Sequence, residues 1–159
     1  ADKDLSQLLG EHDEQWDYAK NVRWRLNGVK AKHGVHAHQL ADYLGLTGDA
    51  VDNIPGVPGI GPKTAATLLS HFGSLDELLE KLDEIPYLRL RSATQHAQKL
   101  REHRDMALLS RKLATIRCDI PLPNGQALGM RTPSDQSALT ALVEQLRFGP
   151  LTRRRLISL

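Results

Sequence analysis

Residues 48–69, GDAVDNIPGVPGIGPKTAATLL, constrain the fold of this chain more than any other stretch. Their centre, residues 57–62, predicts a tight turn, because glycine permits positive φ angles and lets backbone N–H groups come close to a ligand. Pro62 suits the first position of a helix, and apolar residues then continue with helical spacing to Leu69. The sequence therefore predicts a helix-hairpin-helix element whose second helix aims its N-terminus at an anion.

The turn supplies the candidate contacts to a phosphate backbone: Gly59, Ile60, Gly61, Lys63 and Thr64. A lysine in the first turn is unfavourable for the helix dipole but well placed to meet a phosphate. Contacts of this kind hold DNA without reading its bases. The alternative interpretation is an αα-hairpin with a Gly-Pro turn and no ligand.

Two acidic pairs accompany the turn. Asp49 and Asp52 stand directly before it, and Asp2 and Asp4 open the sequence. If residues 47–54 form one or two helical turns, Asp49 and Asp52 share a face and can point at one cation. Because Mg²⁺ prefers oxygen ligands, we expect these four carboxylates to form a metal site. The alternative is that Asp49 caps a short helix while Asp52 faces solvent.

Four motifs in this order resemble the bacterial 5′-nuclease family, which includes the 5′→3′ exonuclease domain of DNA polymerase I and stand-alone flap-endonuclease-like proteins of the exonuclease IX type. The motifs are ADKDLSQLL at 1–9, DYLGLTGDAVDNIPGVPGIGPKTAATLL at 42–69, FGSLDELL at 72–79 and MALLSRKLATIRCDIPL at 106–122. The resemblance implies a mainly helical chain with a short β ribbon, the helix-three-turn-helix lobe of an α/β PIN-like nuclease.

The resemblance also assigns roles. It implies that Asp2, Asp4, Asp49 and Asp52 are catalytic residues that bind two Mg²⁺ or Mn²⁺ ions. Such ions lie roughly 3.5 to 4 Å apart, activate a water for in-line attack on a phosphodiester and stabilise the leaving 3′-oxygen. The product would carry a 5′-phosphate. A K⁺ ion held by backbone carbonyls near residues 54–60 is a further hypothesis.

In the family an α/β half with further metal-binding acids precedes the first motif, and this half lies outside the present sequence. We therefore expect an incomplete active site in this chain alone and a stand-alone nuclease as its parent. The expected organisation is a remnant of the α/β core with the ribbon at 1–35, a helical DNA-binding lobe at 36–113 with the helix-hairpin-helix at 48–72, and a C-terminal extension with a last helix at 114–159.

The net charge of +2 hides a division along the chain. Residues 1–84 hold 8 Lys and Arg against 14 Asp and Glu, and residues 85–159 hold 13 against 5. Bases favour a phosphate backbone, because binding to DNA is driven largely by counterion release. The charge therefore favours a DNA backbone as the partner, and the resemblance implies that this duplex DNA carries a 5′ end or a 5′ flap. Candidate backbone contacts are Lys63, Arg89, Arg91, Lys99, Arg101 and Arg104, although a solvated helix face is the simpler interpretation for any single arginine.

Composition excludes other classes. No apolar run is long enough to span a bilayer and no signal peptide is visible, so we expect a cytoplasmic, nucleoid-associated protein with no membrane partner. The single Cys118 is interpreted as a small buried hydrophobe. Trp16 and Trp24 are interpreted as packing residues of the ribbon, with base-stacking platforms as the alternative. The Arg153–Arg155 run is either a solvated or frayed basic tail or a contact to DNA.

Hydrophobic spacing and turn signals predict a ribbon at 15–18 and 22–26, then helices. The helices are expected at 36–46, 47–54, 62–71 closed by Gly73, Ser74 to about 82, and about 90–113 with a break near 102–105. Extended residues 115–122 and a Pro/Gly-rich loop precede a last helix, capped at Thr132-Pro133 and ending near 147.

These observations favour a structure-selective, metal-dependent 5′–3′ exonuclease or flap endonuclease. The alternative is a non-catalytic helix-hairpin-helix module that tethers a partner to DNA. Carboxylates beside a phosphate argue against a pure binder, because they repel it. A nuclease acting on RNA primers in hybrids is a third hypothesis.

Overall fold

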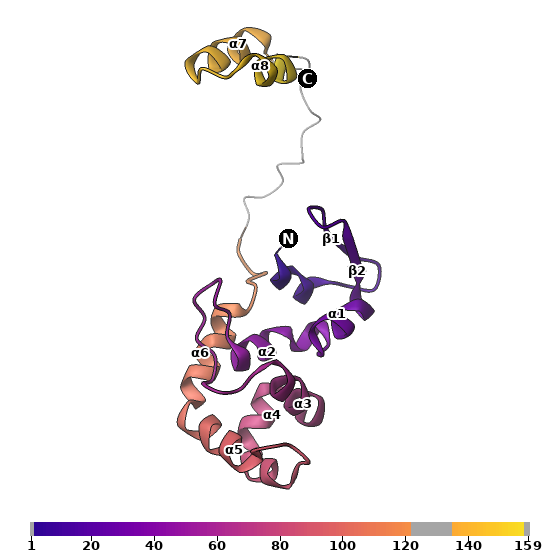
Figure 1. Ribbon diagram of the computed structural model, residues 1–159, viewed down its shortest axis with the longest axis vertical. Helices are drawn as coiled ribbons and strands as arrows, with labels where there is room; N and C mark the ends of the chain where they lie inside the picture. Colours follow the sequence, from indigo (N-terminus) through magenta and orange to yellow (C-terminus); the bar gives the residue numbers. More distant parts are fainter. Residues whose placement is uncertain (1, 122–134, 158–159) are drawn as a thin grey trace. The chain divides into compact units, whose positions relative to one another are not determined.

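A computed structural model describes residues 2–121 and 135–157 (Figure 1). The chain divides into two compact units, residues 1–118 and 119–159. The first unit contains β1 (Glu14–Asp17), β2 (Val22–Arg25), α1 (Leu26–His33), α2 (Leu40–Thr47), α3 (Pro62–Phe72), α4 (Leu75–Glu80), α5 (Ala93–Glu102) and α6 (Arg104–Ala114), with 3₁₀ turns at Lys3–Leu8, Ala37–Gln39 and Leu82–Tyr87. The second contains α7 (Gln136–Gln145) and α8 (Pro150–Ile157). The predicted class, mainly helical with a short β ribbon, is confirmed.

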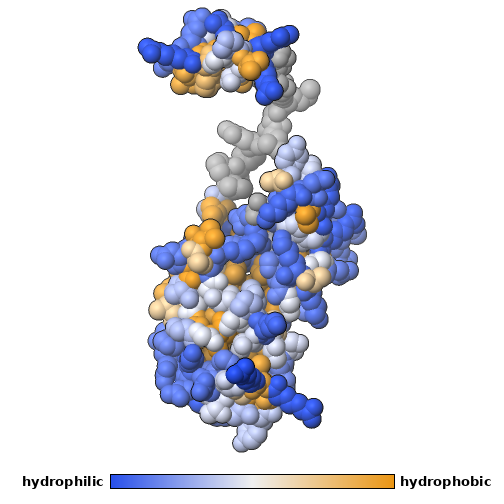
Figure 2. Space-filling model, viewed as in Figure 1, coloured by the Kyte–Doolittle hydropathy of each residue, from blue (hydrophilic) through white to orange (hydrophobic). Residues whose placement is uncertain are grey.

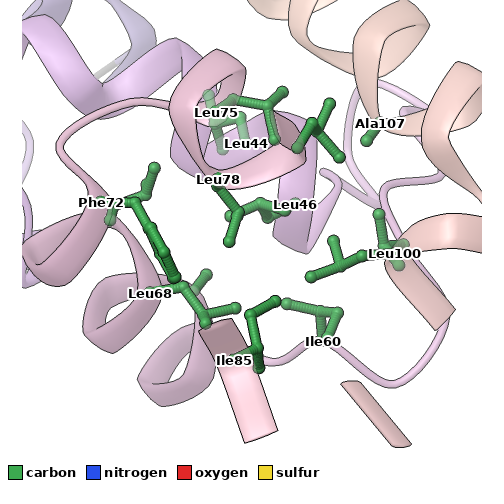
Figure 3. Close-up of a cluster of buried hydrophobic side chains, with 14 of the residues drawn as sticks. Leu44, Leu46, Ile60, Leu68, Phe72, Leu75, Leu78, Ile85, Leu100 and Ala107 are labelled. Carbon is green, nitrogen blue, oxygen red and sulfur yellow. The ribbon is translucent and has the colours of Figure 1, made fainter. Parts of the chain in front are cut away.

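The core of the first unit lies among α2 to α6. Helix α3 buries Ala65, Leu68, Leu69 and Phe72, the i, i+3, i+4, i+7 spacing of an amphipathic helix. Figure 3 shows Leu68 and Phe72 among leucines of α2 and α4 and residues of α5 and α6. Burying one such side chain contributes about 1.5–3 kcal/mol. Hydrophilic residues cover most of the visible face of this unit (Figure 2).

Local signals set the ends of the helices around this core. Pro62 begins α3, and Gly73 ends it at φ +86° with its N–H donating to the carbonyl of Leu69. Ser74 Oγ accepts the N–H of Glu77 at 3.2 Å and begins α4. The predicted break in the long helical region is confirmed, since α5 ends at Glu102 and α6 begins at Arg104, with His103 between them.

The helix predicted at 47–54 is wrong. α2 ends at Thr47, because Gly48 adopts φ +70°, which lies outside the helical range. Asp49 and Ile54 instead form an antiparallel bridge, each N–H donating to the other's carbonyl at 2.8 Å. The acidic residues therefore lie in a tight turn that closes on itself.

Residues of β1 alternate between exposed and buried, and the buried positions are polar. Gln15 and Asp17 are buried, whereas Trp16 is 41% exposed. Trp24 on β2 is buried, and its indole N–H donates to Ser6 Oγ at 3.1 Å. The packing role predicted for both tryptophans is therefore confirmed for Trp24 and wrong for Trp16, because successive strand residues point to opposite faces.

The second unit is a pair of helices. Asp135 caps α7 by accepting the N–H groups of Ser137 and Ala138 at 2.9 and 3.1 Å. The cap predicted at Thr132-Pro133 lies outside the described residues. The Arg153–Arg155 run is exposed, as predicted for a solvated basic segment, but it is helical rather than frayed: it lies in α8, which begins at Pro150, a residue suited to a first helical position.

Two composition-based expectations have different outcomes. Cys118 is exposed, so the prediction of a buried residue is wrong. It lies after the end of α6, in a segment that is neither helix nor strand. Across residues 2–121 and 135–157, no helix has the length and apolar character to cross a membrane.

Candidate metal centre and nucleic-acid interface

Three carboxylates meet beside the turn that follows α2. One oxygen each of Asp4, Asp49 and Asp52 lies within 4.8 Å of the others. Asp4 comes from the 3₁₀ turn Lys3–Leu8, and the other two come from the bridged turn. Asp49 Oδ1 also accepts the N–H of Val51 at 3.1 Å, which fixes the shape of the turn. Tertiary packing and a tight turn, rather than one helical face, thus gather these acids.

Asp2 lies beside this cluster without joining the three-oxygen group. Its Oδ1 accepts the N–H of Asp4 at 3.0 Å and caps the 3₁₀ turn. Asp2, Asp4 and Asp52 nevertheless line one cavity of about 440 Å³, together with Val51 and Leu113. Asp2 therefore faces the same space as the cluster.

A lysine that the sequence analysis missed enters the cluster. The Lys3 ammonium forms an ion pair with Asp49 Oδ2, and the Asp49 side chain keeps only 4% exposure. The hydrogen bond from Lys3 lowers the pKa of Asp49, and the same bond raises the pKa of Lys3. The ADKD motif contained the signal, since a lysine between two acids is drawn toward any third carboxylate nearby.

The cluster still carries uncompensated negative charge. Burial, followed by the charge of Asp2, raises the pKa of Asp4. Oδ1 of Asp4 is buried and has no hydrogen-bond partner among the residues that the structure describes. A buried acceptor without a partner costs about 1–3 kcal/mol, and a cation satisfies it. Oxygen-only donors and this orphaned acceptor fit a hard divalent cation such as Mg²⁺.

The hairpin between α2 and α3 presents open backbone at its tip. Gly59 adopts φ +80°, which favours glycine. Gly61 has φ −90°, so it does not use the positive φ that glycine permits. A Cβ on Gly61 would meet no atom within 4 Å, which leaves room for a ligand at the start of α3.

Ile60 differs from its neighbours in this hairpin. Its side chain is 3% exposed and belongs to the core, and its N–H donates to the carbonyl of Val57 at 3.0 Å. The side chain of Ile60 therefore anchors the turn, and the contact of this residue with DNA stays a prediction. Lys63 is exposed and Thr64 half-buried in the first turn of α3, where Gly61 provides no side-chain cap.

The predicted basic contacts separate into two groups. Lys99 of α5 lies against the hairpin, since a Cβ on Gly59 would collide with its Nζ. Arg101 instead pairs with Asp83, and Arg104 donates to the carbonyl of Leu79 at 2.9 Å. Arg89 and Arg91 are exposed. The structure therefore places Lys63 and Lys99 at the hairpin, and engages Arg101 and Arg104 with the protein itself.

Two residues of α6 hold this region in place and were not predicted. Ser110 is fully buried, and its Oγ accepts the N–H of Gly56 at 3.1 Å. Arg111 donates to Asp42 of α2 at 3.3 Å and to Asp76 of α4 at 2.7 Å. Through these bonds α6 fixes the hairpin and the two helices beneath it.

A family model described as 5′-3′ exonuclease, C-terminal SAM fold, matches residues 35–136. The chain is 38% identical over 154 residues to the DNA polymerase I of Rhizobium leguminosarum, covering 97% of this chain and 15% of that protein. It is 44% identical over 133 residues to the flap endonuclease Xni of Pectobacterium carotovorum subsp. carotovorum, covering 84% of this chain and 48% of that protein. The chain thus spans about half of this flap endonuclease and a much smaller part of the polymerase.

The fold is similar to a solved structure of T5 5′-exonuclease with bound divalent zinc ions. The TM-score is 0.59 at 24% sequence identity, covering 71% of this chain and 40% of that one. A second T5 structure, the D15 protein co-crystallised with metal ions, gives a TM-score of 0.61 at 22% identity over 72% of this chain and 40% of that one. At these identities the similarity concerns the arrangement of the elements.

Proposed function

Because this chain belongs to the 5′-3′ exonuclease family, of which it carries the C-terminal SAM-fold domain, we propose that it is the DNA-gripping and partly metal-binding portion of a divalent-metal-dependent 5′–3′ exonuclease or flap endonuclease. The substrate proposed is duplex DNA with a 5′ end or 5′ flap, cut in replication or repair. The observation that carries the proposal is the buried Oδ1 of Asp4, which has no hydrogen-bond partner among the described residues and belongs to the acid that meets Asp49 and Asp52.

In this proposal Asp4, Asp49 and Asp52 hold Mg²⁺ or Mn²⁺, and Asp2 acts from the rim of the same cavity. An ion held there would lower the pKa of a bound water and would supply positive charge for the phosphate oxygens. Two contacts hold these carboxylates in place: the Asp49–Ile54 bridge, and the cap that Asp2 forms on the 3₁₀ turn. The open cavity on which they border gives a phosphodiester access to them.

The grip on DNA is proposed for the hairpin and the start of α3. Backbone N–H groups of Lys63 and Thr64 lie in the first helical turn, where the helix dipole favours an anion. The open space at Gly61 admits a phosphate, and the ammonium groups of Lys63 and Lys99 supply positive charge near it. None of these groups reads a base, so we expect little sequence preference.

The alternative is a non-catalytic helix-hairpin-helix module. The Lys3–Asp49 ion pair favours it, because an internal ammonium lets part of the acidic cluster persist without a metal. The two functions differ in what loss of a carboxylate does. In a nuclease it removes metal binding and leaves DNA binding intact, whereas in a pure binder it relieves repulsion and strengthens DNA binding.

The test combines the two readouts on the 159-residue chain. Mn²⁺ binding is measured by calorimetry, and cleavage is measured on a 5′-labelled flap duplex with Mg²⁺. Asp52→Asn is compared with Asp105→Asn, an exposed acid on α6 outside the cluster. We expect Asp52→Asn alone to weaken metal binding and to lower any cleavage, with unchanged affinity for the duplex. Equal metal binding by both variants, or tighter DNA binding by Asp52→Asn, contradicts the proposal.

The proposal also includes a monovalent ion at the hairpin, the division of the chain into segments and the location of the protein. A K⁺ ion at the hairpin would use carbonyls of residues 54–60, of which those of Ile54 and Val57 already accept hydrogen bonds at 2.8 and 3.0 Å. The division into segments 1–35, 36–113 and 114–159, and a cytoplasmic, nucleoid-associated location, are also proposed. RNA in hybrids is a competing substrate, since phosphate contacts do not distinguish the sugars.

A further inference from the structure

The outer surface of the β ribbon carries an unusual combination of side chains. We name it the aromatic face and define it by Trp16, Tyr18 and Arg23. The strands β1 and β2 of the ribbon are labelled in Figure 1. On β1 the polar Gln15 and Asp17 are buried and Trp16 faces outward. A strand that only packs does the reverse, with apolar residues inward. Large exposed apolar side chains close together are informative about binding.

The rings of the aromatic face are held in a fixed arrangement. The Trp16 and Tyr18 rings have centroids 4.7 Å apart and planes inclined by 73°. The Arg23 guanidinium carbon lies 4.1 Å from the centroid of Trp16, and the Trp16 indole N–H donates to Asn21 Oδ1 at 3.3 Å. Trp16 and Tyr18 nevertheless keep 41% and 76% exposure. Both rings are therefore oriented before any ligand arrives, which lowers the entropic cost of binding.

The charge around the rings complements a phosphate chain. Lys20, Arg23 and Arg25 belong to the ribbon, against two acids, Glu14 and Asp17. Glu14 pairs with Arg23 at 2.7 Å and only loosely with Arg25 at 3.6 Å, and Asp17 pairs with Lys20 at 3.8 Å. The Lys20 and Arg25 side chains keep 80% and 69% exposure, so both can turn toward an anion.

The ribbon is also hydrogen-bonded to the segment that contains Asp2 and Ser6. Gln15 Nε2 donates to the backbone carbonyl of Asp2 at 2.5 Å, and Ser6 Oγ donates to Gln15 Oε1 at 2.5 Å. Gln15 and Trp16 are neighbours on opposite faces of β1. Trp16 of the aromatic face is therefore the sequence neighbour of Gln15, which hydrogen-bonds directly to Asp2, the first acid of the proposed metal site.

We propose that the aromatic face binds single-stranded nucleic acid, with bases stacked on Trp16 and Tyr18 and phosphates met by Lys20, Arg23 and Arg25. Aromatic rings combined with basic side chains are how sequence-tolerant single-strand binders work. The proposal deepens the proposed function and rests on it, because a 5′ flap is a single strand that leaves the duplex near the acids. A protein partner on this face is the competing occupant.

Intrinsic fluorescence tests the proposal directly. The chain contains two tryptophans, and Trp24 is buried, so quenching by a ligand that stacks reports on Trp16. The probe is an oligothymidylate of about 12 nucleotides, within the usual site size. We expect saturable quenching in the parent chain and no quenching of the remaining emission in Trp16→Leu.

Affinity supplies the second readout, by anisotropy of the labelled oligonucleotide. Base stacking is worth about 1–3 kcal/mol, so Trp16→Leu should bind about 5- to 150-fold more weakly. Trp16→Phe should retain most of the affinity. The matched control is Tyr87→Leu, which removes another aromatic ring, 89% exposed, from the 3₁₀ turn Leu82–Tyr87. Thermal melting of each variant checks that it folds.

A blunt duplex, measured alongside, separates this proposal from the proposed function. Duplex binding without any single-strand binding overturns the aromatic face and leaves the proposed function standing. Single-strand binding lost in Trp16→Leu supports the aromatic face, even if duplex binding is absent and the proposed function fails. Equal single-strand affinity of Trp16→Leu and Tyr87→Leu overturns the proposal and points to a protein partner on this face.

Discussion

Replacing Lys3 by methionine tests whether this lysine acts as an internal substitute for a metal. The substitution keeps the length of the side chain and removes the ammonium that pairs with Asp49. Asp4, Asp49 and Asp52 then retain oxygens within 4.8 Å of one another with no positive charge between them. We expect Lys3→Met to be less stable than the parent chain when no metal is present. We also expect it to bind divalent metal more tightly than the parent chain.

The structure sets the size of the effect. Two like charges 4.8 Å apart repel by about 3.5 kcal/mol at an effective dielectric constant of about 20. Breaking a buried ion pair costs about 3–5 kcal/mol, but the Lys3 side chain keeps 38% exposure, so solvent screening reduces this to about 2–3 kcal/mol. For a chain of this size, that is a fall in Tm of about 4–12 °C.

Metal should then reverse the loss. A ligand that binds only the folded state stabilises it by RT ln(1 + [L]/Kd), so the variant with the lower Kd gains more. The assay is thermal melting by circular dichroism over a series of Mg²⁺ concentrations, with Mn²⁺ binding by calorimetry. Lys81→Met is the matched control, because Lys81 and Glu77 form an exposed pair at 3.5 Å. It should shift stability by less than about 1 kcal/mol, independently of metal.

Two results would refute this reasoning. An unchanged Tm of Lys3→Met in the absence of metal would mean that Lys3 does not stabilise the acidic cluster. A deficit that stays constant as Mg²⁺ rises would mean that the cluster does not bind this metal in place of the lysine.

Three further predictions concern the hairpin and α6. Gly61→Ala should leave Tm nearly unchanged yet weaken duplex binding, since its Cβ fills open space, whereas Gly59→Ala should cost about 1–2 kcal/mol in a melt because of its φ of +80°. A Gly61→Ala protein that binds duplex normally would contradict the hairpin contact. Lys63→Ala should weaken duplex binding and reduce the slope of log K against log salt by about 0.9, and an unchanged slope would exclude a phosphate contact. The Arg111 hydrogen bond lowers the pKa of Asp76, so the stability it adds is present above about pH 4 and lost as pH falls through the folded-state pKa. The Tm gap between the parent chain and Arg111→Gln should accordingly narrow in acid, and a constant gap would assign the effect to packing.

Elements with local signals were predictable from the sequence. Pro62 and Gly73 bound α3, Ser74 caps α4, and apolar spacing gives the core face of α3. These features depend on contacts within a few residues of one another, so the chain carries them wherever it packs. The helix-hairpin-helix and the mainly helical class followed from them.

Elements whose structure depends on distant neighbours were not predictable. Spacing suggested a helix at 47–54, but Gly48 adopts φ +70° and Asp49 bridges to Ile54 instead. The sequence also did not show which face of β1 is buried, because an alternating strand can turn either set of residues inward until one face packs. Ser6 and Asp2 bind Gln15, and that choice turns Trp16 outward.

The candidate site divides in the same way. The sequence by itself determined which residue types are present: paired acids, a glycine hairpin and a lysine at the start of a helix. Only the tertiary structure decided which of them meet. It brings Asp4 to Asp49 and Asp52, leaves Asp2 outside that group but lining the same cavity as Asp4 and Asp52, pairs Lys3 with Asp49 and sets Lys99 against Gly59. The physical reason is that electrostatic and hydrogen-bond energies depend on distance in space, which separation along the chain does not specify.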